Sequence, residues 1–186
     1  MKFGLFVIVS HEIPCYPIVN HAGAAGWFGE RADVFLSTTI NGVDAKGRVS
    51  VPADFRAVVR GGPFDGIIVW PSFDGPYLEG GGQALLERYQ ALIEDMDPYD
   101  DARIAFERAI FGAAKPLTFD ANGRVTLPKE LSDHAGLDGK ATFVGLGSRF
   151  EIWAPEAFEE HKRSAQAFAR DNKRSLRPGA RPGGAA

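Results

Sequence analysis

Two arginines stand directly after a glycine in two segments that repeat one another. The segment VDAKGRVSVP, residues 43–52, contains Arg48, and FDANGRVTLP, residues 119–128, contains Arg124 at the matching position 76 residues later. A guanidinium group offers five N–H donors in a fixed plane, which suits phosphate oxygens and the edge of guanine. Two such groups held by one scaffold therefore indicate contacts to the backbone or base edges of nucleic acid.

Each repeated segment predicts a β-hairpin. Asp44 and Asp120 open the turns, and Gly47 and Gly123 supply the residues that adopt a positive φ. In the strand that follows, valine or leucine alternates with serine or threonine. The arginine beside the glycine is then on the face opposite the buried valine, and we expect it to project from the hairpin tip.

The two tips differ in charge. Lys46 occupies the first tip, and Asn122 occupies the same place in the second. Both side chains can bond to a base or a phosphate, but we expect the second tip to bind more weakly because it has one cation fewer. From spacing alone, an equally good interpretation is that each arginine is a solvent-exposed side chain that pairs with the aspartate of its own turn.

The elements around the hairpins are readable from apolar spacing and from glycine and proline positions. Short strands are expected at 35–43, 67–70, 77–78, 141–146 and 150–153, and short helices after Pro52 and around 131–137. A helix over 83–96 is followed by a second one that Asp97 caps and Gly112 ends. A final helix begins at Pro155, and the Arg-, Pro- and Gly-rich segment 170–186 is expected to be disordered.

Charge is distributed unevenly along the chain. Its 186 residues carry a net charge of −3, which argues against a protein that coats nucleic acid through bulk positive charge. Residues 79–107 contain eight acidic residues against two arginines, whereas residues 161–186 contain seven basic residues against one aspartate. Any contact with DNA must therefore be local.

The duplicated Asp-x-x-Gly-Arg hairpin, the helical insert between its copies and the later segment GLGSRFEIW, 145–153, resemble the MraZ family of bacterial regulators in the AbrB/SpoVT superfamily. The resemblance runs from about residue 35 to about residue 158. It implies an α+β fold: a duplicated AbrB-like swapped-hairpin β-barrel, an intrachain pseudo-dimer, with a connecting helical pair and a C-terminal helix. The corresponding boundaries are a disordered leader or misassigned start at 1–33, repeat 1 at 36–83, connecting helices at 84–113, repeat 2 at 114–157, and the helix end with its basic tail at 158–186.

The resemblance also implies a function. The hairpin loop would contact double-stranded promoter DNA with its arginine as the main donor, and the chain would self-associate into a ring-like homo-oligomer that binds tandem repeats. It would act in the cytoplasm, associated with the nucleoid, as a repressor of the division and cell-wall gene cluster that includes its own gene. The alternative is an antitoxin-like module of the same superfamily that binds a protein, although antitoxins usually carry one hairpin per chain.

Catalytic, cofactor and metal sites are not predicted. The chain lacks a nucleophile elbow, a phosphate-binding loop, a paired-cysteine zinc site and a dinucleotide fingerprint, so we do not expect an enzyme. His11, Cys15 and His21 have neither a fourth ligand nor a tight paired spacing. The acidic group at 94–101 lacks the spacing of a calcium loop. No apolar run approaches the roughly 20 residues of a membrane helix, so no membrane partner is expected.

Overall fold

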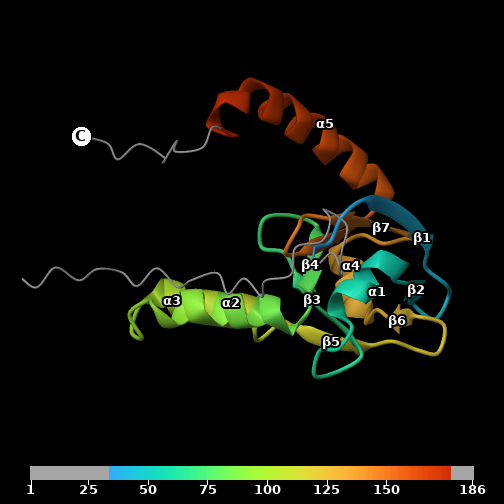
Figure 1. Cartoon of the computed structure of the whole chain (residues 1–186), viewed down its shortest axis with the longest axis horizontal. Coiled ribbons are helices and arrows are strands. Elements are labelled where there is room, and N and C mark those ends of the chain that lie inside the picture. Colours follow the sequence, from blue (N-terminus) through green and yellow to red (C-terminus); the bar gives the residue numbers. More distant parts are fainter. Residues whose placement is uncertain (1–33, 177–186) are drawn as a thin grey trace, which may run out of the picture. The chain divides into compact units, whose positions relative to one another are not determined.

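The computed structural model describes residues 34–176 of the chain (Figure 1). The first half contains β1 (Thr38–Gly42), β2 (Arg48–Ser50), α1 (Ala53–Val59), β3 (Gly66–Pro71), β4 (Tyr77–Gly81), α2 (Gln83–Glu94) and α3 (Asp101–Ile110). The second half contains β5 (Lys115–Thr118), β6 (Arg124–Thr126), α4 (Lys129–His134), β7 (Lys140–Gly145), β8 (Phe150–Trp153), α5 (Pro155–Asp171) and a 3-10 turn (Lys173–Leu176). The expected leader at 1–33 lies outside the described residues.

The order of elements repeats itself. The sequence β1-β2-α1-β3-β4 returns as β5-β6-α4-β7-β8, with α2 and α3 between the copies. Six strands form one antiparallel sheet in the order β1-β7-β8-β4-β3-β5, so the first strand of each repeat pairs with the third strand of the other. Exchanging the two repeats reverses this order and leaves it otherwise unchanged. The fold is a mixed α+β fold with an antiparallel sheet and five α-helices among the described residues.

The remaining two strands, β2 and β6, form a second ladder with each other, and β2 also makes a single bridge to Val43 of its own hairpin. Val49 is opposite Val125 at the centre of this antiparallel ladder, and both side chains are almost completely buried. The ladder extends at both ends, because the Val51 N–H donates to the carbonyl oxygen of Gly123 and the Leu127 N–H donates to that of Gly47. Each hairpin is therefore hydrogen-bonded to the turn of the other.

The core beneath this ladder is built on aromatic side chains from both repeats. Phe55 of α1 is fully buried and packs edge-on against Phe35 and Phe143, with Phe150 tilted against it at a centroid distance of 5.4 Å. Edge-to-face contacts of this kind stabilise a core beyond the apolar area that they bury. Because Phe143 and Phe150 come from β7 and β8, Phe55 links the two repeats.

The connecting helices α2 and α3 lie side by side (Figure 1). Leu85, Ile93 and Ile110 from these helices pack with Ile68 and Trp70 of β3 in a second apolar cluster. The predicted cap of the second helix was wrong by three residues. Asp100, not Asp97, caps α3, and its carboxylate accepts the N–H of Ala102 at 2.8 Å.

Local turn chemistry explains this shift. The carboxylate of Asp97 accepts the N–H of Tyr99, and its carbonyl oxygen accepts the N–H of Asp100, so residues 97–100 form a turn ahead of the helix. Aspartate favours both such turns and helix caps, so its presence alone does not decide between them. The proline between them is compatible with either conformation and does not distinguish them.

The C-terminal helix α5 begins at Pro155, as predicted, and continues to Asp171. With the 3-10 turn that follows, residues 170–176 are largely helical, which corrects the prediction that disorder begins at residue 170; residues 177–186 lie outside the described part. Phe158 near the start of α5 is buried against Trp153, whereas Phe168 is exposed. None of the helices within residues 34–176 is long and apolar enough to cross a bilayer.

The shared aromatic core makes a stability prediction. Phe55→Ala removes a fully buried ring and should lower the free energy of unfolding by about 3–5 kcal/mol. Leu92→Ala on α2, whose side chain is exposed, serves as the control and should change it by less than about 0.5 kcal/mol. Urea denaturation of both variants measures the difference. Equal stability of the two variants would contradict a core centred on Phe55.

Candidate nucleic-acid interface

The two predicted turns have the same backbone geometry. Asp44 Oδ1 accepts the N–H groups of Lys46 and Arg48 at 2.9 and 3.0 Å, and the Gly47 N–H donates to the Asp44 carbonyl oxygen. Gly47 has a φ of +74°, a left-handed conformation that L side chains rarely adopt. The predicted turn-forming roles of Asp44 and Gly47 agree with this geometry.

The second turn is formed in the same way. Asp120 Oδ1 accepts the N–H groups of Asn122 and Arg124 at 2.8 and 3.0 Å, and Gly123 has a φ of +71°. One carboxylate oxygen in each turn thus satisfies two backbone donors that would otherwise face solvent. The tip residues Lys46 and Asn122 are exposed, each on the outside of its turn.

Each arginine folds back onto the aspartate of its own turn. Nε and Nη2 of Arg48 both lie 2.7 Å from Asp44 Oδ2, and the same atoms of Arg124 lie 2.8 and 2.7 Å from Asp120 Oδ2. The arginine side chains are 36% and 29% exposed, so they lie along the tips and do not extend freely into solvent. The alternative interpretation of the sequence, an ion pair within each turn, therefore describes their geometry.

The ion pairs leave one edge of each guanidinium group open. Nε–H and one N–H of Nη2 point to the carboxylate, and no hydrogen bond or ion pair within residues 34–176 involves Nη1 of either arginine. Nη1 and the second N–H of Nη2 form the edge that can donate two parallel hydrogen bonds to a phosphate or to guanine. The aspartate thus orients the arginine without using this edge.

The ion pairs also set the ionisation of the turns. The side-chain hydrogen bond from Arg48 lowers the pKa of Asp44 from 3.8 to about 2, and Arg124 has the same effect on the pKa of Asp120. Backbone N–H donors add to both shifts, and partial desolvation opposes them. The hydrogen bond and charge of Asp44 raise the pKa of Arg48, and the charge of Asp120 raises it further. The two turns are therefore close enough to interact electrostatically.

The β2–β6 register places both arginines on one face. Arg48 is opposite Thr126, and Arg124 is opposite Ser50, so the two arginines occupy diagonal positions of the ladder. Diagonal neighbours in an antiparallel pair lie roughly 7–8 Å apart. The buried valines occupy the other face, as the alternating pattern of the sequence predicted. The structure thus brings the two repeated motifs together from positions 76 residues apart.

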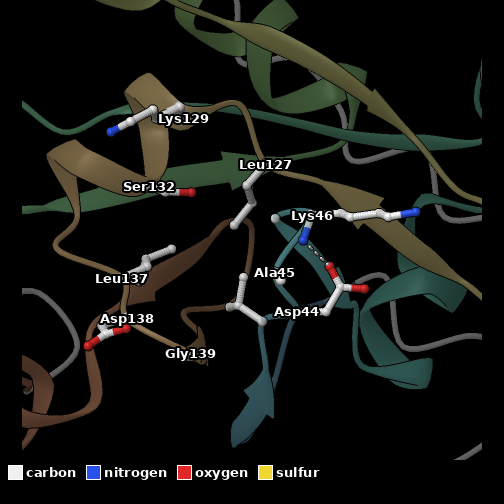
Figure 2. A pocket seen from close by; sticks show the side chains of 11 residues that line it. Asp44, Ala45, Lys46, Leu127, Lys129, Ser132, Leu137, Asp138 and Gly139 are labelled. Atoms are coloured by element: carbon white, nitrogen blue, oxygen red, sulfur yellow. Dashed lines mark hydrogen bonds between the residues drawn. The ribbon is translucent and has the colours of Figure 1, made fainter.

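Sequence reasoning missed the neighbours of the two turn glycines. Arg56 of α1 lies against Gly123, where a Cβ atom would fall 2.6 Å from the Arg56 Cζ. Ser132 of α4, the residue 76 positions after Arg56, lies instead beside a surface pocket of about 620 Å³ next to the first turn. Figure 2 shows Ser132, Leu137 and Asp138 on one side of this pocket, with the Lys46 side chain directed away from them. Residues 56 and 132 are 76 positions apart, the same offset as the two hairpins, so aligning the repeats would have shown that an arginine in the first copy corresponds to a serine in the second.

Metal binding receives no geometric support from the described part of the chain. Residues 34–176 contain no group of three or more histidine, cysteine, aspartate or glutamate side chains placed to hold an ion. The acidic group at 94–101 caps a helix and forms a turn, as described above. His11, Cys15 and His21 lie outside the described residues.

Comparisons with known proteins agree with the resemblance to the MraZ family. A family model described as "MraZ protein, putative antitoxin-like" matches residues 110–177. A protein of Rickettsia akari (strain Hartford) named "Transcriptional regulator MraZ" is 48% identical over 145 residues, which cover 78% of this chain and 97% of that protein. A protein of the same name from Caulobacter vibrioides (strain NA1000 / CB15N) is 47% identical over 144 residues, covering 77% and 92%.

These relatives define a class of proteins named as regulators of transcription, and the similarity extends over nearly their whole length. The chain belongs to the MraZ family.

The ion pairs predict how the turn carboxylates titrate. In Arg124→Gln, the pKa of Asp120 should rise from about 2 toward 3.8, while that of Asp44 stays near 2. Because the folded-state pKa values are depressed, the stabilisation from each pair is complete above pH 3.8 and is lost as the pH falls toward 2. Carboxyl-carbon NMR titration measures both groups, with Arg48→Gln as the reciprocal control. Unchanged titration of Asp120 in Arg124→Gln would show that the pair does not persist in solution.

A second prediction compares two glycines with positive φ. Gly47→Ala and Gly136→Ala both place a side chain in a left-handed conformation, which costs about 1–3 kcal/mol. At Gly47 the new Cβ would also lie 2.9 Å from the Leu127 carbonyl oxygen, whereas nothing lies within 4 Å at Gly136. Thermal denaturation should therefore show a larger loss for Gly47→Ala. A larger loss for Gly136→Ala would mean that the two repeats do not contact each other at this turn.

Proposed function

We propose that this chain is a sequence-specific DNA-binding regulator of transcription that contacts promoter DNA through the two hairpin tips. Arg48 and Arg124 are the principal donors, and Lys46 and Asn122 add contacts from the turns. The observation that carries the proposal is the placement of both arginines on one face of the β2–β6 ladder, each with an open Nη1–Nη2 edge. Membership in the MraZ family adds support, because relatives are named transcriptional regulators.

The ion pair within each turn prepares the arginine for binding. A flexible arginine loses conformational freedom when it binds, which costs about 0.5–1.5 kcal/mol for an immobilised side chain. Asp44 and Asp120 restrict this freedom beforehand by holding Nε and Nη2. The open edge can then form paired hydrogen bonds with O6 and N7 of guanine or with phosphate oxygens.

For the fold, the proposal is an AbrB-like swapped-hairpin β-barrel in which the two repeats stand in for the subunits of a dimer. Its support is the exchange of β1 and β5 between the repeats and the hydrogen bonds that join each hairpin to the other turn. The domain boundaries proposed from the sequence follow the same division. Such a barrel presents two tips at a constant separation to two positions along the DNA.

We propose that several copies form a ring-like homo-oligomer, so that modest contacts per subunit add up on tandem promoter repeats. This arrangement reconciles a net charge of −3 with DNA binding. The proposed target is the promoter of the division and cell-wall gene cluster, including the gene for this chain. There the protein would act as a repressor in the cytoplasm, associated with the nucleoid.

The test uses a duplex with the sequence upstream of this chain's own gene and a scrambled duplex of equal length. Arg48→Ala should weaken binding sharply, and the double variant with Arg124→Ala should weaken it further. A lost guanine contact costs about 1–3 kcal/mol mainly on the upstream duplex, whereas a lost phosphate contact weakens both duplexes and flattens the salt dependence. Fluorescence anisotropy across a salt series separates the two cases.

Arg163→Ala, which removes an exposed arginine from α5, is the control and should leave binding unchanged. Oligomer size should be the same for all these variants, and the melting temperature should fall only slightly in the arginine variants, because the exposed Asp–Arg pairs contribute little compared with the core. If the double variant binds the upstream duplex as tightly as the unmodified protein, the hairpin tips are not the DNA contact. A protein partner, as in an antitoxin-like module, then becomes the better interpretation.

A further inference from the structure

The two hairpin tips differ in their local charge. Asp44 and Arg48 form an ion pair in the first turn, so its net positive charge comes from Lys46. In the second turn Asp120 and Arg124 form the same pair, but Asn122 replaces the lysine and leaves the turn itself without net charge. A neutral tip gains little from counterion release when it approaches a phosphate.

A cation from the other repeat lies against this neutral turn. Arg56 belongs to α1, and its Nε–H donates to the Val51 carbonyl oxygen at 3.2 Å. This bond places the guanidinium group on the backbone of Gly123, where a Cβ atom would lie 2.5 Å from Nη1 and 2.8 Å from Nε. Val51 also donates its N–H to the Gly123 carbonyl oxygen, so one residue anchors both the turn and the arginine.

Arg56 differs from the hairpin arginines in its charge environment. Arg56 forms no ion pair with a carboxylate of residues 34–176, whereas Arg48 and Arg124 each pair with an aspartate. Its side chain is half-buried, which limits its conformational freedom, and Nη1 and Nη2 have no hydrogen-bond partner in the same part of the chain. It therefore carries an uncompensated positive charge at the second tip.

The first tip has no such residue. Ser132 is in the corresponding place on α4 and is too short to reach across the pocket beside Gly47 (Figure 2). Gly47 is half-buried, whereas Gly123 is buried under Arg56. Lys129 also lines this pocket, but its charge is paired with Asp133. Apart from it, the two tips have the same number of cations from different sources: Lys46 and Arg48 at the first, and Arg56 and Arg124 at the second.

We propose that Arg56 is a DNA-binding residue of the second tip, where it contacts a backbone phosphate and supplies the charge that Lys46 supplies at the first tip. The inference rests on the proposed function, because it requires that the tips bind DNA. If it holds, the second tip binds DNA as well as the first, in contrast to the expectation drawn from the missing lysine. It also assigns a reason for a glycine at position 123 beyond its positive φ, since any side chain there would displace the guanidinium group.

The test compares Arg56→Gln with Lys46→Gln on the duplex upstream of this chain's gene and on its scrambled counterpart. Each substitution should weaken binding to both duplexes at low salt. Each should also flatten the slope of log affinity against log salt by about 0.9 for every phosphate contact that is lost. Arg60→Gln removes an exposed arginine at the end of the same helix and is the matched control, with an expected slope equal to that of the unmodified protein.

Two further variants separate charge from structure. Arg56→Lys keeps the charge and should retain most of the slope. Asn122→Lys, added to Arg56→Gln, should restore the slope by placing the cation where the first tip has it. Failure of this restoration, or an unchanged slope in Arg56→Gln while Arg48→Ala loses binding, would overturn the role of Arg56 alone. If the unmodified protein binds neither duplex, the proposed function fails and this inference fails with it.

Discussion

The antiparallel pairing of β2 with β6 is the constraint on which the rest of the interface depends. It is only three residues long, and each strand has no other partner in a regular ladder. Its stability comes from the buried Val49–Val125 pair and from hydrogen bonds between each strand end and the opposite turn glycine. Because this ladder joins the two repeats, it also sets the spacing of their arginines. A shift of one residue between the strands would place the two arginines on opposite faces and turn one of them toward the core.

The Asp–Arg pair has two roles that are not independent. It closes the turn through one carboxylate oxygen and orients the guanidinium group through the other. The same carboxylate places a negative charge beside the surface proposed to meet phosphate, which lowers the attraction that a lone arginine would have. For the proposed phosphate contact a second cation would offset this charge, and the chain has Lys46 at the first turn and Arg56 against the second.

The whole chain is acidic, whereas the hairpin tips have a local positive charge. The acidic residues of α2, α3 and the turn between them repel phosphate, whereas Lys46 makes the first turn locally basic and Arg56 of α1 adds a positive charge beside the second. A polyanion approaching this molecule is attracted at the tips and repelled at the helical pair. The placement of charge, and not its total, makes the proposed local DNA contact compatible with a net charge of −3.

Features that depend on neighbouring residues were determined by the sequence itself. The turns at residues 44–47 and 120–123, the positive φ of their glycines and the alternation of valine in β2 and β6 all arise from interactions within about five residues. The cap of α3 is the exception. Both Asp97 and Asp100 could cap the helix, and the sequence does not show which of them does.

Only the tertiary structure decided which segments meet. The pairing of β1 with β7 joins residues about a hundred positions apart, and a period-two pattern identifies a strand without identifying its partner. For the same reason the sequence did not reveal that Arg56 lies on Gly123, since that contact depends on how α1 leaves the β2–β6 ladder and reaches the other repeat. Short-range backbone chemistry determined each hairpin, whereas long-range packing decided that two hairpins and an arginine from α1 form one surface.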